Sequence, residues 1–387
     1  MAWRFGGTRE EVEALTQTVS EIAQIQRTLL ANYPDLLRLD RAAHQQQIAA
    51  GKAVLEIATQ LPPELDGVGI LVAGSKTMGI GRLSTGLGCP HLETDPDFLG
   101  LMLAFQTRAR ERVDFLAIND PTAPTATPEE FIALLAATAA AAGTEIPFGD
   151  VGQLDLGNLT AAQAKLFHTL KDRLGLASAS RIYTHLVRQT ARTTLSSSAV
   201  QQYWTGVVEV GPTPGKFTFV PTRDVNRHRA LRPGARHLTE DWEGRSRAGD
   251  IAFTMRWIPF LSERETPLEN LTKTWSETHA VPVGTVTFPQ VEPGSREARL
   301  VSLLATEMGA NPGHWVGTRA GEARPEFPAT RFTAARRLAY ALSQEKRGAL
   351  PEQAYQEFFD SGGTIGPTLE RELVRRQDAR RPPAHST

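Results

Sequence analysis

The sequence lacks several features that often assign a chain to a class at first sight. It contains one cysteine, Cys89, so an internal disulfide is excluded, and no Cys-x-x-Cys or Cys/His spacing of a zinc site is present. No stretch approaches the ~20 apolar residues that a membrane helix needs. The start, MAWRFGGTREEVEALTQ, has no apolar run, so we expect no signal peptide and a cytoplasmic location.

An excess of charge of one sign is also absent. The 387 residues include 42 basic and 43 acidic side chains, which leaves a formal net charge of -1. A chain with almost no net charge has no general electrostatic attraction to nucleic acid or to an anionic membrane, so we expect neither partner. Hydrophobic residues make up 41% and charged residues 22%, which is typical of a globular protein with a sizeable core.

Two candidate motifs do not carry a function. The glycine-rich segment GSKTMGIGRLSTGLG contains Gly79-x-Gly81, but it lacks the Walker lysine pattern, and Ser84 stands where a dinucleotide fold needs its third glycine. We interpret this segment as a barrel corner. The nine histidines are scattered without helical metal-binding spacing, although ligands from distant segments can still converge.

The hydrophobic pattern predicts an amino-terminal helix followed by strands. Residues 8–32 have apolar side chains at three- and four-residue spacing, with Thr8 and Glu11 at capping-box spacing. From 51 to 119 the chain changes to short apolar strands, which are AVLEIA, GVGILVAG, TMGIGRLST, FLGLMLAF and RVDFLAIN. Their close succession favours an antiparallel sheet or barrel over alternating βαβ units.

Strands and helices alternate along the rest of the chain. Thr127 and Pro128 have the pattern of a helix start. Helices are predicted at 128–142, 160–174, 178–193, 330–346, 351–361 and 367–378. Strands are predicted at 207–220, 250–260 and 282–291. Residues 221–250 combine many arginines with proline and glycine, which we interpret as a solvated loop, with an anion site as the alternative.

Three segments carry side chains suited to chemistry. They are Arg41-Ala-Ala-His44, Arg82-Leu-Ser84-Thr85 and Arg336-Arg-Leu-Ala-Tyr340, which Arg347 follows. On a helix, Arg336, Tyr340 and Arg347 lie near one face. An adjacent guanidinium favours the phenolate form of tyrosine, and a tyrosinate is an axial ligand type of haem iron. The third segment therefore fits an iron ligand with a cation for a haem carboxylate, and it also fits an ordinary helix surface.

Together these segments resemble the haem catalase family over about residues 38–348. The family's motifs occur here in the same order and at matching offsets. The matches are Arg41-Ala-Ala-His44, Arg82-Leu-Ser84-Thr85, Ile118-Asn119-Asp120-Pro121 with Phe131 ten residues later, Arg336-x-x-x-Tyr340, Arg347, and the segments TPLENLTKTWSE and VPVGTVTFPQVE.

The resemblance implies an α+β fold, a catalase-like antiparallel β-barrel wrapped by helices. It divides the chain into a helical extension (1–34), a haem-binding barrel (35–325) and a carboxy-terminal part (326–387) that begins with the proximal haem helix. The amino-terminal helix and the helical tail would frame the barrel. Catalase relatives are usually oligomers, so we expect a homo-oligomer, a dimer or a tetramer.

The resemblance also implies roles for individual residues around haem b. Tyr340 would bind the iron as a phenolate with Arg336 beside it, and His44 would move protons between peroxide oxygens. Ser84 would orient the imidazole, and Phe131 would pack on the porphyrin. The residues that would pair with the haem carboxylates are Arg41, Arg82 and Arg347. Each residue also has a structural alternative, such as a surface histidine or a core phenylalanine.

The sequence departs from the family at the distal side of the haem. A gapless alignment places Ile118 where catalases have their distal asparagine, whereas a shift by one residue places Asn119 there as a catalytic group. An isoleucine cannot donate a hydrogen bond to a peroxide. Ala123 and Pro124 replace the phenylalanines that narrow the family's channel, which favours a wider pocket and a larger substrate.

The expected function is therefore a haem-dependent peroxidase or catalase-like enzyme with weak catalase activity. Its substrates would be hydrogen peroxide or organic hydroperoxides, together with a small organic electron donor. One alternative is a hydroperoxide isomerase or lyase like the catalase-related allene oxide synthases, or another biosynthetic haem oxidase. The other is a haem-binding or sensor protein without turnover.

Overall fold

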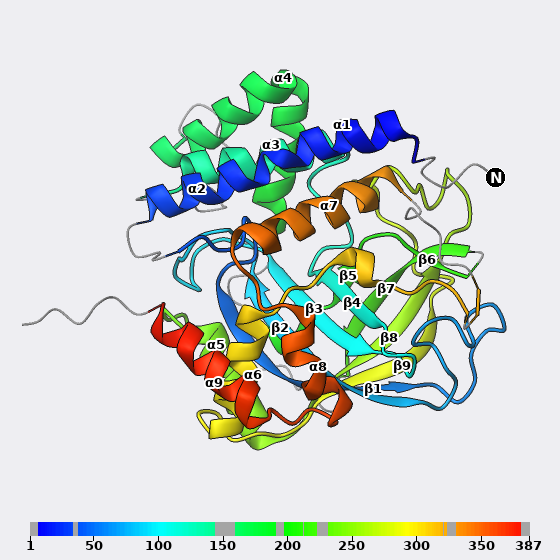
Figure 1. Ribbon diagram of the computed structural model, residues 1–387. Helices are drawn as coiled ribbons and strands as arrows, with labels where there is room; N and C mark the ends of the chain where they lie inside the picture. The colour runs from blue at the N-terminus through cyan, green and yellow to red at the C-terminus, as the bar shows by residue number, and fades with distance from the viewer. Residues whose placement is uncertain are drawn as a thin grey trace, which may run out of the picture.

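An antiparallel β-barrel forms the centre of the molecule (Figure 1). The computed structural model describes residues 7–33, 38–143, 159–190, 197–211, 213–222, 231–319, 321–322 and 330–380. The strands are β1 (Gln47–Ile57), β2 (Lys76–Thr85), β3 (Leu99–Gln106), β4 (Arg112–Ile118), β5 (Tyr203–Thr205), β6 (Val208–Val210), β7 (Thr213–Pro221), β8 (Ile251–Pro259) and β9 (Val281–Phe288). The prediction of a barrel wrapped by helices is confirmed.

The short strand β5 closes the barrel. The strands pair in the order β5-β4-β3-β2-β1-β9-β8-β7, and β5 pairs with β7 to complete the ring, while β6 pairs with β7 outside it. β5 is three residues long. It meets β4 only at Ala117–Thr205 and Ile118–Trp204, and β7 only at Tyr203–Phe219 and Trp204–Thr218. This junction is therefore the thinnest part of the wall.

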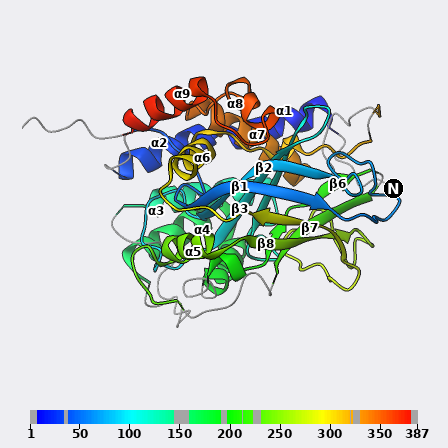
Figure 2. The ribbon, with the colours of Figure 1, turned by 90° about the horizontal axis from the view of Figure 1, so that it is seen from below.

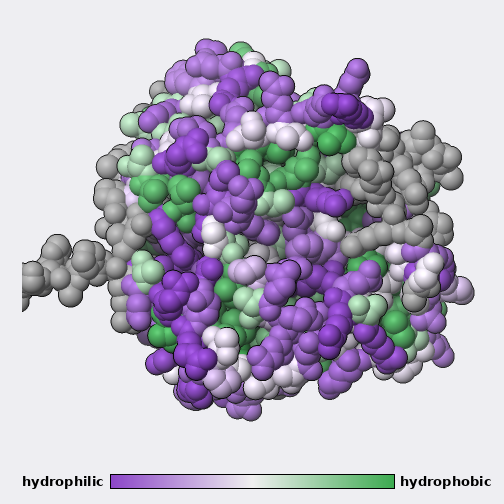
Figure 3. All heavy atoms as spheres, viewed as in Figure 1, coloured by the Kyte–Doolittle hydropathy of each residue, from purple (hydrophilic) through white to green (hydrophobic). Residues whose placement is uncertain are grey.

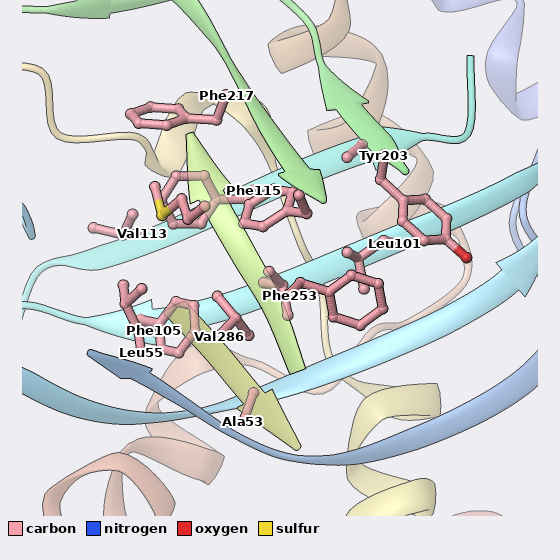
Figure 4. Close-up of a cluster of buried hydrophobic side chains, with 14 of the residues drawn as sticks. Ala53, Leu55, Leu101, Phe105, Val113, Phe115, Tyr203, Phe217, Phe253 and Val286 are labelled. Carbon is pink, nitrogen blue, oxygen red and sulfur yellow. The ribbon is translucent and has the colours of Figure 1, made fainter. Parts of the chain in front are cut away.

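Aromatic and aliphatic side chains fill the barrel (Figure 4). Phe115 of β4 lies at its centre, with its ring 5.3 Å from that of Phe217 and 5.8 Å from that of Phe219, both edge-to-face. Edge-to-face pairs are favourable because the positive edge of one ring meets the negative face of the other. The barrel is thus a packed core, and any site for a larger ligand lies outside it.

The glycines of the segment GSKTMGIGRLSTGLG have a packing role. Gly79 and Gly81 lie within β2 and not at a barrel corner, so that interpretation is wrong. A Cβ atom at Gly79 would lie 2.3 Å from the ring of Phe105, and one at Gly81 would lie 2.3 Å from the ring of Phe288. Glycine is needed here because large side chains approach the strand backbone closely.

A helical layer covers one side of the barrel (Figure 1). Its helices are α1 (Arg9–Ser20), α2 (Ile22–Asn32), α3 (Pro128–Ala141), α4 (Ala161–Thr190) and α7 (Arg331–Lys346). The capping box of Thr8 and Glu11 is confirmed, and Thr127 caps α3 as predicted. The predicted break within α4 occurs at Gly175, whose φ of 80° is not helical. Helix α7 contacts α1, α2 and α3.

Further helices cover other parts of the barrel, and in Figure 2 the strands lie between helices above and below them. They are α5 (His237–Ala248), α6 (Arg296–Glu307), α8 (Glu352–Asp360) and α9 (Pro367–Asp378). Helices α6, α8 and α9 share an apolar cluster with Ile80 and Met102 on the outer face of the barrel. Hydrophilic residues cover most of the face shown in Figure 3, with apolar patches between them. No described helix has the length and apolarity to cross a membrane.

Three segments differ from the sequence-based expectation. Residues 67–74 form turns instead of a strand, because Gly67, Gly69 and Gly74 adopt positive φ angles. The loop expected at 221–250 contains α5, whose first amides Leu238 N and Thr239 N donate to Glu93. Residues 223–230 of that loop and 191–193 of a predicted helix lie outside the described residues. Helix α6 was not predicted.

Candidate functional site

A mainly apolar cavity lies between the outer face of the barrel and the helical layer. Its volume, measured as the space that the centre of a water molecule can occupy, is about 250 Å³. Its walls come from the segment before β1, from β2, β3, β4, β5 and β7, and from α3 and α7. The sequence-predicted site residues that line it are Arg41, His44, Arg82, Ser84, Phe131, Arg336, Tyr340 and Arg347.

The barrel side of this cavity carries His44 above a row of residues from three strands. Ser84 of β2 lies opposite Gly100 of β3, and Gly100 lies opposite Ile118 of β4. Opposed residues point to the same face of a sheet, so all three face the cavity. A Cβ atom at Gly100 would lie 2.5 Å from His44 Nδ1, so glycine is needed to leave room for the imidazole.

The backbone of His44 adopts an unusual conformation. Its φ of 54° lies in the left-handed region, which costs a non-glycine residue about 1–3 kcal/mol. Its amide donates to Gly86 O at 2.9 Å, and Gln45 N donates to Leu87 O at 3.0 Å. These bonds hold the strained turn in place. Such strain is found where a side chain must be aimed at a particular place, and here it aims the imidazole at the cavity.

Hydrogen bonding fixes the tautomer of His44. Its Nδ1 lies 3.1 Å from Thr85 O and 3.3 Å from Ser84 Oγ. Because a backbone carbonyl only accepts, Nδ1 must carry the hydrogen. The Ser84 hydroxyl then accepts a share of the same hydrogen. In the neutral ring the free electron pair is consequently on Nε2.

The imidazole is neutral at physiological pH. Burial lowers the pKa of His44 to about 4, although the charge of Asp97 acts in the opposite direction. Repulsion from the guanidinium groups of Arg82 and Arg336 lowers the pKa further. A neutral imidazole with an available Nε2 can accept a proton from a ligand in the cavity.

The loop between β2 and β3 supports His44 from the side. Phe98 meets the imidazole edge-on, with the ring centroids 5.4 Å apart. Asp97 accepts from Gly86 N at 2.8 Å and from Leu87 N at 2.9 Å, and its Oδ2 lies 3.2 Å from Nε2 of the buried His91. Asp97 thereby fixes the segment to which His44 is hydrogen-bonded.

Asp97→Asn is expected to destabilise the fold most at low pH. Burial lowers the pKa of His91, but hydrogen bonding to Asp97 outweighs it and raises the pKa to about 10. The stabilisation is therefore complete below the unfolded pKa of ~6.5 and is lost as the pH rises through about 10. In urea denaturation the variant should lose about 3–5 kcal/mol at pH 6 and less at pH 10. Asp95→Asn in the same loop is the control, and a pH-independent deficit for Asp97→Asn would contradict the assignment.

The helical side of the cavity carries Tyr340 and Arg336, one turn apart on α7. The Oγ1 atom of Thr330 caps this helix, and Thr333 Oγ1 donates to Val207 O at 3.1 Å, which ties its first turn to the barrel. Arg336 Nη2 lies 3.5 Å from Tyr340 Oη, and the guanidinium lies 5.5 Å from the centre of the phenol ring. A permanent cation thus adjoins the phenol oxygen.

Three arginines, of which Arg82 and Arg347 are buried and Arg41 is half-buried, form one end of the cavity. Arg41 donates to the backbone oxygens of Thr306 and Met308 at the carboxy-terminal end of α6, where the helix dipole favours cations. Arg82 donates to His44 O at 2.9 Å, and Arg347 donates to Met308 O at 2.9 Å. The backbone therefore positions these guanidinium groups.

The charge of this arginine cluster is only partly neutralised by the protein. Arg41 Nη1 lies 3.5 Å from Asp40 Oδ1, whereas among the described residues neither Arg82 nor Arg347 bonds to a carboxylate. Burial, and then the charge of Arg41, hold the pKa values of Arg82 and Arg347 well below the usual arginine value. A buried cluster of like charge is stable only with anions beside it. The site therefore fits a ligand that brings carboxylates.

Ile118, not Asn119, faces the cavity. The Asn119 side chain accepts from Leu99 N at 2.8 Å and donates to Gln201 Oε1 at 3.4 Å. It is thus committed to the backbone of the neighbouring strand, and we correct its expected catalytic role on this ground. Phe131 lines the cavity and lies 5.8 Å from the ring of Phe332.

Several cavity residues were not predicted from the sequence. They include Phe98 and Gly100 beside His44, and Lys216 of β7. A phenylalanine before a strand and a glycine within one have no distinctive local pattern. In the described part of the chain, no group of three His, Cys, Asp or Glu side chains is placed to hold a metal ion.

Comparison with known proteins identifies relatives only by structure. No protein-family model and no curated protein matches the sequence. A fungal catalase aligns with a TM-score of 0.62 at 14% identity, covering 85% of this chain and 64% of its own. A bacterial catalase aligns with a TM-score of 0.58 at 19% identity, covering 85% and 60%.

The chain has a catalase-like fold. Catalase A from Saccharomyces cerevisiae gives a similar result, with a TM-score of 0.59 at 13% identity over 86% of this chain and 66% of its own. The chain thus spans less than two thirds of the length of these catalases. The catalase-like fold confirms the predicted architecture, and at these identities it leaves the activity to be argued from the site.

Proposed function

We propose that this chain is a haem-dependent enzyme that consumes peroxides, acting as a peroxidase more than as a fast catalase. One observation carries the proposal: a neutral His44, a phenol beside a cation and three arginines without sufficient anions line the same cavity. Haem matches this set because it brings two carboxylates for the arginines and an iron for a phenolate oxygen.

The residues would divide the binding of haem among three sides. The arginine cluster, which consists of Arg41, Arg82 and Arg347, would pair with the haem carboxylates. Tyr340 would supply its phenol oxygen to the iron from α7, with the guanidinium of Arg336 beside that oxygen. Phe131, together with other apolar side chains of the lining, would pack on the porphyrin and exclude water.

The chemistry that a bound haem supplies is cleavage of the oxygen–oxygen bond at its iron. His44 Nε2 would accept a proton from the peroxide and return it to the departing oxygen. Ser84 and Thr85 O hold the ring while this proton moves. The product that leaves is water from hydrogen peroxide and an alcohol from an organic hydroperoxide.

The cavity wall beside His44 favours a larger and less polar substrate. Ile118 stands in the row with Ser84 and Gly100, and it offers no hydrogen bond to a peroxide. Cleavage would depend on His44 alone, which disfavours fast disproportionation of hydrogen peroxide. The same apolar wall favours, as a second candidate, a hydroperoxide isomerase that needs no electron donor.

Haem reconstitution followed by turnover tests this proposal. The purified protein should take up haem stoichiometrically and give a ferric absorption band. Added hydrogen peroxide, and in parallel cumene hydroperoxide, should be consumed with oxidation of a phenolic donor and little release of oxygen. Consumption without a donor would select the isomerase, bound haem without turnover would select a haem-binding protein, and failure to bind haem would overturn the proposal.

Arg347→Met is expected to have opposite effects on the two forms of the protein. In the haem-free form it removes a buried charge next to Arg41 and should raise the free energy of unfolding by about 1 kcal/mol or more. In the haem-bound form it removes a charge-assisted hydrogen bond and should weaken haem affinity about ten-fold or more. Thermal unfolding of both forms and the rate of haem release to an excess of acceptor protein measure these effects.

The exposed Arg371 of α9 provides the matched control for this charge change. Arg371→Met removes the same charge at an exposed position outside the cavity lining and should leave both measurements unchanged. If Arg347→Met destabilised both forms equally, Arg347 would be a structural residue and not a carboxylate-binding one.

A further inference from the structure

Lys216 differs from the other lysines of the chain. It is 3% exposed, whereas the others, all within the described residues, are exposed or half-buried. Those others are Lys52, Lys76, Lys165, Lys171, Lys273 and Lys346. A buried ammonium group is costly unless an anion accompanies it. The position of Lys216 therefore calls for an explanation.

The alternation of side chains along β7 places Lys216 in the cavity wall. Phe217 and Phe219 of β7 point into the barrel core, so Lys216 points to the outer face. There it lines the cavity, with its Nζ atom 4.8 Å from the centre of the Trp275 ring. An aromatic face stabilises a cation in part, but it leaves the ammonium hydrogens free to donate.

Among the described residues, no carboxylate neutralises Lys216. Burial alone lowers the pKa of its ammonium group to about 8, without a contribution from any charged neighbour. The buried arginines, in contrast, lower one another's pKa values. Lys216 is thus electrostatically separate from the arginine cluster. The cavity therefore has a further cationic position outside the arginine cluster.

The side chains around Lys216 indicate which kind of anionic ligand fits there. Trp275 belongs to an apolar cluster with Leu271 and Phe332, which also line the cavity. Trp204 and Phe131 pack against this cluster and line the cavity as well. A ligand at this end must therefore be apolar along most of its length and carry one negative charge.

We propose that Lys216 binds the carboxylate of an apolar monocarboxylic acid whose chain lies in the cavity along the Leu271–Phe332 wall. The inference deepens the proposed function, because the substrate would then be an organic hydroperoxide that carries a carboxylate. The binding itself requires no haem, so it stands or falls independently of peroxide turnover.

Calorimetric titration with decanoate and decan-1-ol tests this site in haem-free and haem-loaded protein. The wild type should bind decanoate about ten-fold or more tightly than decan-1-ol, as one charge-assisted hydrogen bond predicts. Lys216→Met keeps the apolar stem and removes the charge, so it should bind the two ligands with equal affinity. Lys273→Met, at an exposed lysine near Trp275, should behave as the wild type.

Two outcomes would overturn the proposal. One is equal affinity of the wild type for the acid and the alcohol, including no binding of either. The other is an unchanged decanoate affinity in folded Lys216→Met. If that variant does not fold, the comparison of decanoate with methyl decanoate in the wild type decides, since the ester keeps the chain and loses the charge. A protein that binds decanoate through Lys216 but takes up no haem would keep this site and reject only the peroxide chemistry.

Discussion

Tyr340→Phe is expected to prevent stable haem binding while leaving the fold intact. The phenol oxygen is the group that would ligate the iron from α7, and Arg336 Nη2 lies 3.5 Å from it. Loss of an outer partner of a metal ligand already costs ~10–100-fold in affinity, so loss of the ligand itself should cost at least ~100-fold. The ferric absorption band should be lost or strongly shifted, and haem titration measures the affinity.

Tyr183→Phe is the matched control for this experiment. Tyr183 is buried in α4 against Phe167 and does not line the cavity, so the variant loses the same hydroxyl without touching the site. Its absorption spectrum should match that of the wild type. An unchanged spectrum in Tyr340→Phe would show that another residue ligates the iron, and it would remove the main support for the catalase-like site.

His44→Ala is expected to slow peroxide cleavage while retaining haem. A positioned proton-transfer group contributes about 10²–10⁴-fold to a rate, and Ile118 offers no replacement donor in the same wall. Haem affinity should change little, because the arginine cluster and Tyr340 lie elsewhere in the cavity lining. Single-turnover mixing of the haem-loaded protein with cumene hydroperoxide measures this step directly.

The pH dependence of the same step provides an independent measurement. Burial lowers the pKa of His44 to about 4, so the reactive neutral imidazole predominates at pH 6–8. The rate should be flat across that range and fall as the pH drops through about 4. His279→Ala, at an exposed histidine, should retain the wild-type rate and profile. Loss of activity with a midpoint near the ordinary histidine pKa would contradict the buried state of His44.

Local sequence patterns predicted those parts of the site that lie within one element. Arg336 and Tyr340 share a helix face because four residues make about one turn. The caps Thr8 and Thr127 act within their own helices. Family resemblance gave the residues that now line one cavity from four segments, which spacing alone would not have joined.

The rest of the site depends on contacts between segments far apart in the chain. Asn119 and Ile118 are neighbours in sequence, and only the strand register shows which of them faces His44. Lys216 was missed because β7 is buried on both faces, so its alternation does not separate the core side from the cavity side. Helix α6 has a local signal in its cap Ser295, which accepts from Ala298 N.

The short strand β5 has a consequence for how the barrel moves. Its three residues are held by four residue pairs in all, and Trp204 and Thr205 also line the cavity. Local openings of a fold begin where the fewest hydrogen bonds must break. Local opening of the barrel is therefore expected first where β5 pairs with β4 and β7, directly beside the cavity. A ligand that packs against Trp204 would stabilise the pairing of β5 with β4 and β7. Occupancy of the cavity and rigidity of the barrel are therefore linked.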